Sequence, residues 1–135
     1  MDTFPNTPLL RRALLVDAGI SGLVALLMVE LAATLSSLTA LPSPLLLGAG
    51  LAMLPYIAFL VFLATRQELP AWPVRAVVAM NFAWAALCVG LLASRATDAN
   101  AFGVAFVLAQ AAAVLAFAEL QVVALRRSVP ARRYA

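Results

Sequence analysis

Three polar side chains lie inside long apolar segments of this sequence, and they are the residues best suited to chemistry. They are the carboxylates Asp17 and Glu119 and the amide Asn81. Counted inward from the nearest flanking arginine, Asp17 is five residues in, Asn81 six and Glu119 seven, a depth of roughly 7–11 Å in a helix. Because an ionisable group inside a membrane span is costly and usually functional, we expect a polar layer that takes up a proton or binds a cationic head group.

A purely structural role for the same residues stays open. Asp17 and Glu119 are shallow enough for their carboxylates to reach the membrane surface, where Arg12, Arg66 or Arg126 could pair with them. Such ion pairs would only hold the helices together. Proton or ligand binding requires instead a cavity beside the polar layer.

Two aromatic residues belong to the same candidate site, and three further polar residues are secondary candidates. We expect Tyr56 and Trp84 either to line a ligand cavity or to fill the core between helices. Glu30 lies near the opposite membrane surface, where its carboxylate can reach water. Gln110 is expected to form an interhelical hydrogen bond, within this chain or to another one, and Gln121 is a further polar group of the last apolar segment.

The elements that position these residues are apolar helices. Of the 135 residues, 65% are hydrophobic and 11% are charged, whereas soluble domains average roughly 45–50% and about 25%. Segments 14–35, 45–65, 74–94 and 102–125 each reach the length of about 20 residues that a bilayer-spanning helix needs. Their short connections make successive helices antiparallel. The sequence therefore predicts an all-α, polytopic membrane protein, a single integral-membrane domain over residues 1–135 folded as an antiparallel bundle of four transmembrane helices.

Prolines predict where these helices are interrupted. Pro5 and Pro8 are expected to keep residues 1–12 out of a regular helix. Residues 36–44 are expected to form a short turn between the first two spans. Pro55, in the middle of the second span, is expected to kink it.

The arginines predict the orientation in the membrane. All nine basic residues are arginine. The N-terminal segment carries two, the connection at residues 66–75 two and the C-terminal segment four, whereas the opposite side has only Arg95. Cytoplasmic loops carry the excess of positive charge, so we expect both termini in the cytoplasm and the protein in the inner membrane.

Several classes of site lack the residues they need. Histidine is absent and Cys88 is the single cysteine, so the usual haem, iron–sulfur and zinc ligands are missing and no metal or other cofactor is expected. Cys88 is expected to be a small buried apolar side chain. The arginines flank apolar runs instead of alternating with aromatic residues, so no nucleic-acid partner is expected.

A weak internal repeat relates the two halves of the sequence. Arg11 precedes Asp17 by six residues, and Arg75 precedes Asn81 by the same number. This spacing is compatible with two similar helical hairpins related by an axis along the membrane normal. It is also compatible with four unrelated apolar helices of similar composition.

Three short motifs carry a resemblance to known proteins. They are N-F-A-W at 81–84, F-V-L-A-Q at 106–110 and A-E-L-Q at 118–121, the last of which precedes a pair of arginines. With these motifs the sequence resembles small four-helix bacterial inner-membrane proteins that have no assigned role. The resemblance implies the four-helix fold and brings no activity with it.

The order of polar residues is also loosely similar to that of small multidrug transporters. Those proteins have a carboxylate in the first span, a tyrosine in the second and a tryptophan in the third. Asp17 or Glu30, Tyr56 and Trp84 follow the same order here. The similarity concerns layout alone, because a shared fold does not imply a shared function.

Three functions are compatible with these residues. The first is a non-catalytic membrane protein, either an accessory or assembly subunit or a lipid-binding scaffold, whose partners are membrane lipid, other membrane subunits or copies of itself. The second is a small-molecule transporter or ligand-binding bundle, with Asp17 and Glu119 as coupling carboxylates and Asn81, Tyr56 and Trp84 lining the cavity. The third is a membrane enzyme that uses the two carboxylates for proton transfer.

Overall fold

Four long helices dominate the structure, a computed structural model that describes residues 2–128 of the chain. They are α1 (Pro8–Glu30), α3 (Ser43–Thr65), α4 (Ala71–Ala93) and α5 (Ala101–Ser128). All four are long and apolar enough to span a membrane. The predicted all-helical class and the four apolar helices are therefore confirmed.

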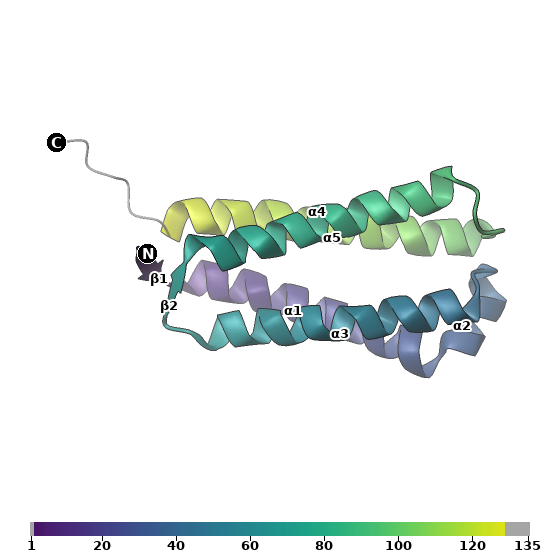
Figure 1. Cartoon of the computed structure of the whole chain (residues 1–135), viewed down its shortest axis with the longest axis horizontal. Helices are drawn as coiled ribbons and strands as arrows, with labels where there is room; N and C mark the ends of the chain where they lie inside the picture. Colours follow the sequence, from purple (N-terminus) through teal and green to yellow (C-terminus); the bar gives the residue numbers. More distant parts are fainter. Residues whose placement is uncertain (1, 129–135) are drawn as a thin grey trace.

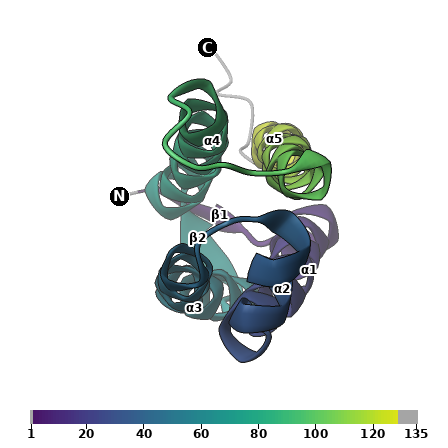
Figure 2. The same ribbon diagram turned by 90° about the vertical axis from the view of Figure 1, so that its right-hand side faces the viewer.

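The long helices lie side by side along the long axis of the molecule (Figure 1). Viewed along that axis, they occupy the four corners of a square (Figure 2). The closest packing is of α1 against α3 and of α4 against α5. We call the first pair the N-terminal hairpin and the second the C-terminal hairpin. The two hairpins meet through α1 and α5, whereas α3 and α4 make little contact with each other.

The first helix begins earlier than the sequence predicted. The prolines were expected to exclude residues 1–12 from a helix, but α1 starts at Pro8. A proline fits the first turn because its missing N–H would have no partner there. The side chain of Thr7 caps the helix by accepting a hydrogen bond from the backbone N–H of Leu10, 3.4 Å away.

The connection between the first two spans also differs from its prediction. A short helix, α2 (Ala32–Thr39), follows α1 directly, so most of residues 36–44 is helical and not a turn. The chain then reverses at Ala40, whose φ is 58°. In the next helix Pro55 lies inside α3, and the helix continues on both sides of it from Ser43 to Thr65.

Two short strands, which the sequence did not predict, close one end of the molecule. Strand β1 (Thr3–Pro5) pairs antiparallel with β2 (Glu68–Pro70), with Phe4 opposite Leu69. Both of these apolar side chains are buried. The strands lie at the same end of the molecule as the start of α1 and the end of α5 (Figure 1), where the Thr7 and Ser128 hydroxyls are 2.7 Å apart.

The arginines are divided between the two ends as the sequence suggested. Arg11 and Arg66 are at the strand end, where an Arg11 Nη2 donates to the Arg66 carbonyl. Arg95 is in the connection between α4 and α5 at the other end, where the backbone N–H of Asn100 donates to the Thr39 carbonyl. Two further arginines of the C-terminal segment, Arg132 and Arg133, lie outside the described residues.

Large apolar side chains cover the outside of the helices. Leu23, Leu87 and Phe102 are 60%, 68% and 75% exposed. A water-soluble protein rarely exposes so continuous an apolar surface. The outer surface is therefore that of a membrane-embedded protein, in agreement with the four apolar helices.

Candidate functional site

A cluster of hydrogen-bonded polar side chains lies in the interior of the molecule, with Asp17 at its centre. Its Oδ2 atom accepts hydrogen bonds from Tyr56 Oη at 2.7 Å, Gln121 Nε2 at 2.7 Å and Asn81 Nδ2 at 3.1 Å. Its Oδ1 atom accepts one from Ser21 Oγ at 2.9 Å. We call these five residues the polar cluster.

Each of the four long helices contributes to the polar cluster. Asp17 and Ser21 are one turn apart on α1, so they share a face of that helix. Tyr56 comes from α3, Asn81 from α4 and Gln121 from α5. The side chains of Asp17, Asn81 and Gln121 are only 0%, 2% and 0% exposed. The cluster is therefore an interhelical connection in the core.

Three of its hydrogen bonds join the N-terminal hairpin to the C-terminal hairpin. Asn81 and Gln121, in the second hairpin, both donate to Asp17 in the first. Tyr56 Oη is also 3.0 Å from Asn81 Oδ1, across the same boundary. Within the second hairpin, Asn81 Nδ2 donates to Gln121 Oε1 at 3.0 Å. Two of the three hydrogen bonds that join the hairpins in this cluster are thus accepted by the Asp17 carboxylate.

The hydrogen-bond partners of Asp17 are all uncharged. The seven arginines between residues 2 and 128 have exposed side chains, whereas Asp17 is fully buried. The alternative in which Asp17 pairs with Arg12 or Arg66 at the membrane surface does not match this geometry. A buried carboxylate without a counter-charge is a costly group that its hydrogen bonds stabilise only in part.

Glu119 does not join the polar layer as the sequence analysis expected. Its side chain is exposed on the outside of α5, and Gln121 contributes to the cluster instead. Two residues along a helix correspond to a rotation of about 200°, so these two side chains point in nearly opposite directions. Glu119 therefore lies at a depth in the bundle similar to that of Asp17, but its side chain points outward instead of into the core.

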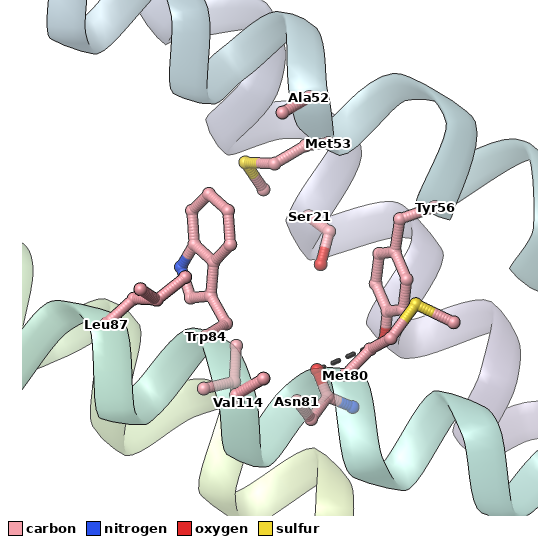
Figure 3. Close-up of a pocket in the computed structure, with 10 residues that line it drawn as sticks. Ser21, Ala52, Met53, Tyr56, Met80, Asn81, Trp84, Leu87 and Val114 are labelled. Atoms are coloured by element: carbon pink, nitrogen blue, oxygen red, sulfur yellow. Dashed lines mark hydrogen bonds between the residues drawn. The ribbon is translucent and has the colours of Figure 1, made fainter.

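Tyr56 and Asn81 also line a pocket between the two hairpins. The pocket has a volume of about 200 Å³, and its lining includes Ser21 and Trp84 as well. Figure 3 shows the Trp84 ring projecting from α4 into the pocket, opposite Met53. Asp17 is not part of this lining, so its contact with the pocket passes through its partners.

A second pocket of about 270 Å³ adjoins the first. Trp84 and Leu87 line both, and the second pocket extends past Cys88 towards Gln110. The indole Nε1 of Trp84 lies 3.4 Å from Gln110 Oε1, so Gln110 forms an interhelical contact within this chain. We call the two pockets together the α3–α4 groove, because they lie where those helices make little contact with each other.

The remaining candidates lie away from the polar cluster. Glu30 is exposed at the end of α1. Cys88 is buried and lines the apolar part of the groove. Within residues 2–128, the structure contains no group of three or more histidine, cysteine, aspartate or glutamate side chains that could hold a metal ion.

Sequence reasoning identified Asp17, Asn81 and Tyr56 but placed Gln121 among the lesser candidates. One signal for Gln121 was available in the sequence, because it follows Gln110 by 11 residues, which puts the two amide side chains on the same face of the last helix.

Comparisons with known proteins add no further candidate. No family model, curated protein or solved structure matches this chain. The polar cluster and the groove are therefore the features from which a function can be inferred.

Proposed function

We propose that this is a non-catalytic integral membrane protein that binds a single lipid-like molecule carrying one hydrogen-bonding polar group. The α3–α4 groove would hold the ligand, with the polar group at Tyr56 and Asn81 and the apolar part along Trp84 and Cys88. The observation that carries this proposal is the groove itself, a mostly apolar pocket with polar side chains at Tyr56 and Asn81 and a further one at Gln110.

The shape and chemistry of the groove support this ligand class. Small-molecule pockets usually measure roughly 300–1,000 Å³ and are mostly apolar, with a few polar groups that orient the ligand. The two adjoining pockets, of about 200 and 270 Å³, together fall within that range. A ligand that is mainly apolar would partition into the bilayer first and then enter from the side, between α3 and α4.

The arrangement of the carboxylates favours binding over catalysis. A membrane enzyme that transfers protons needs an acid and a base at the same site. Asp17 is fully buried behind Tyr56 and Asn81, whereas Glu119 is exposed on the outside of α5. The two carboxylates would therefore not act on one substrate.

The proposed orientation has four antiparallel transmembrane helices with both termini in the cytoplasm of a bacterial cell. The gathering of Arg11, Arg66, Arg126 and Arg127 at one end supports it, as does the single Arg95 at the other. In a Cys88→Ala background, cysteines replacing Thr3 and Asp98 would be labelled with a membrane-impermeant maleimide in intact cells. Labelling at position 98 alone is expected, and labelling at position 3 alone would reverse the orientation.

Fluorescence quenching of Trp84 tests the binding site directly. The Trp72→Phe variant keeps Trp84 as its only tryptophan, and Trp84→Phe keeps Trp72, which is 55% exposed near the membrane surface. Both variants are reconstituted into phosphatidylcholine vesicles, and brominated octadecanol is added as the quencher. We expect saturable quenching of Trp84 that unbrominated octadecanol reverses and octadecane does not.

Bulk lipid contact would give a different result. Quenching that rises linearly with the brominated alcohol, equally for Trp84 and Trp72, would overturn the proposed site. Tyr56→Phe serves as the matched test of the polar end, because it removes the hydroxyl and leaves the aromatic ring. It is expected to weaken the effect of octadecanol and to leave that of octadecane unchanged.

A further inference from the structure

We infer that Asp17 is a proton-binding site, and that proton uptake there turns the Tyr56 hydroxyl towards Asn81 and so weakens binding of the ligand's polar group in the α3–α4 groove. The second part rests on the proposed function, whereas the first is a property of the polar cluster alone. The inference follows from the number of hydrogen atoms available in the cluster and from the position of Tyr56 and Asn81 in the lining of the groove.

The Tyr56 hydroxyl has too few hydrogens for its two acceptors. It carries one hydrogen atom, yet its oxygen is 2.7 Å from Asp17 Oδ2 and 3.0 Å from Asn81 Oδ1. Both amide hydrogens of Asn81 Nδ2 are already directed at Asp17 and Gln121. When Asp17 is ionised, Tyr56 donates to its carboxylate, and Asn81 Oδ1 has no donor from the tyrosine.

One added proton on Asp17 supplies the donor that Asn81 Oδ1 lacks. With the proton on Oδ2, Asp17 donates to the Tyr56 oxygen, and the Tyr56 hydrogen turns to Asn81 Oδ1. Water that enters the groove supplies this proton, because Tyr56 and Asn81 line the pocket and Asp17 does not. In a concerted step Tyr56 passes its hydroxyl proton to Asp17 and receives one from the groove, so that no covalent bond between heavy atoms changes.

Protonation would change what the groove offers to a ligand. While Asp17 is ionised, Asn81 Oδ1 lies in the pocket lining without a donor from Tyr56, so it can accept a hydrogen bond from the polar group of the ligand. After proton uptake the Tyr56 hydroxyl donates to Asn81 Oδ1, which adds a hydrogen bond between α3 and α4 and competes with the ligand for that oxygen. Binding of a ligand that carries a hydroxyl is therefore expected to weaken when Asp17 is protonated.

No second charged group between residues 2 and 128 faces Asp17 from the helices around it. On α1 itself, Arg11, Arg12 and Glu30 are exposed. The helix α3 contributes Tyr56 alone, since it contains no charged residue. On α4 Arg75 is exposed and Cys88 lies in the second pocket, and on α5 the charged residues Glu119, Arg126 and Arg127 are exposed. Proton uptake in the core is therefore assigned to Asp17.

Infrared difference spectroscopy tests the proton site without any ligand. The wild-type protein in phosphatidylcholine vesicles is titrated from high to low pH, and the C=O stretching band of a protonated carboxylic acid is recorded. We expect one component of this band to disappear in Asp17→Asn and to persist in the matched variants Glu30→Gln and Glu119→Gln, while the exposed carboxylates contribute the remainder of the band. Circular dichroism establishes that each variant is folded. If Asp17→Asn loses no component that both matched variants keep, the inference is overturned.

The coupling is tested by the pH dependence of Trp84 quenching. In the Trp72→Phe protein, the concentration of brominated octadecanol at half-quenching should rise about fivefold as Asp17 becomes protonated. Asp17→Asn should give one value at every pH. A pH-independent wild type with an intact Asp17 band would refute the coupling but not the proton site. Loss of saturable quenching would refute the proposed function while leaving the infrared result unaffected.

Discussion

The Asp17 carboxylate and the Asn81 side-chain amide are hydrogen-bonded at 3.1 Å, although 64 residues separate them in the chain. They occupy corresponding positions in the weak repeat, each six residues after an arginine. Their partners Tyr56 and Gln121 come from the second helix of each hairpin. The halves of the chain therefore meet through like positions, which is the arrangement expected of two related hairpins.

Replacement of Asn81 by alanine should destabilise the protein. The substitution removes two donors and leaves the Asp17 and Gln121 oxygens short of partners in the core, at an expected loss of about 2–3 kcal/mol. Phe82→Ala is the control, because Phe82 is adjacent and 50% exposed. Thermal unfolding in detergent, followed by circular dichroism, measures both. Equal losses would show that the Asn81 hydrogen bonds contribute nothing specific.

Replacement of Gln121 by glutamate and, separately, of Glu119 by glutamine should show which of the two side chains belongs to the polar cluster. Gln121→Glu brings a second carboxylate to within about 3 Å of Asp17, where like charges repel strongly. We expect it to unfold at a markedly lower temperature than wild type at neutral pH and to recover in acid. Glu119→Gln should change the unfolding temperature little, because the side chain is exposed. The reverse pattern would place Glu119 in the core.

Gly50→Ala should destabilise the packing of α1 against α3. A Cβ atom there would lie 3.0 Å from both Met28 Cβ and Val29 Cγ2, so these neighbours on α1 would have to shift by a few tenths of an ångström. Overpacking of this kind costs about 1–3 kcal/mol. Gly48→Ala, two residues away with open space around it, is the matched control and should be neutral or slightly stabilising. Unfolding of the two variants in detergent checks the difference, and similar stabilities would contradict it.

Cys88 should report ligand occupancy. As the single cysteine, it lines the apolar part of the groove and is 9% exposed. We expect slow labelling by N-ethylmaleimide in vesicles and further slowing by octadecanol. Leu54→Cys in a Cys88→Ala background is the control, because Leu54 is 48% exposed and does not line the groove. If octadecanol protected both positions equally, its effect would be on the bilayer and not on the site.

The sequence predicted the helices well because apolar length alone determines them. It predicted their ends less well. Pro8 looked like a helix breaker, yet it begins α1, and a turn was expected where α2 continues to Thr39. The strands could not be predicted, since Phe4 and Leu69 become a pair only after the helices have brought distant segments together.

The polar layer was predicted from the depth of each residue along its helix. Depth alone does not determine the direction in which a side chain points. Asp17 and Asn81 were both expected in it, and the structure brings their side chains together. Glu119 had the right depth and the wrong direction. Small residues line more than one face of α5, and the alanines on the same face as Glu119, Ala112 and Ala116, are exposed. The buried face carries Gln121.

The pairing of β1 with β2 bears on the order in which the chain can assemble during synthesis. Residues 3–70 close on themselves through these strands, so the N-terminal hairpin can be complete before α4 leaves the ribosome. At that stage Asp17 has Ser21 and Tyr56 as partners, and its Oδ2 atom can still accept the donors that Asn81 and Gln121 later supply. In a bilayer, where no water offers competing donors, that free acceptor would draw the second hairpin into position. The same carboxylate that joins the halves of the finished protein would thus direct its assembly.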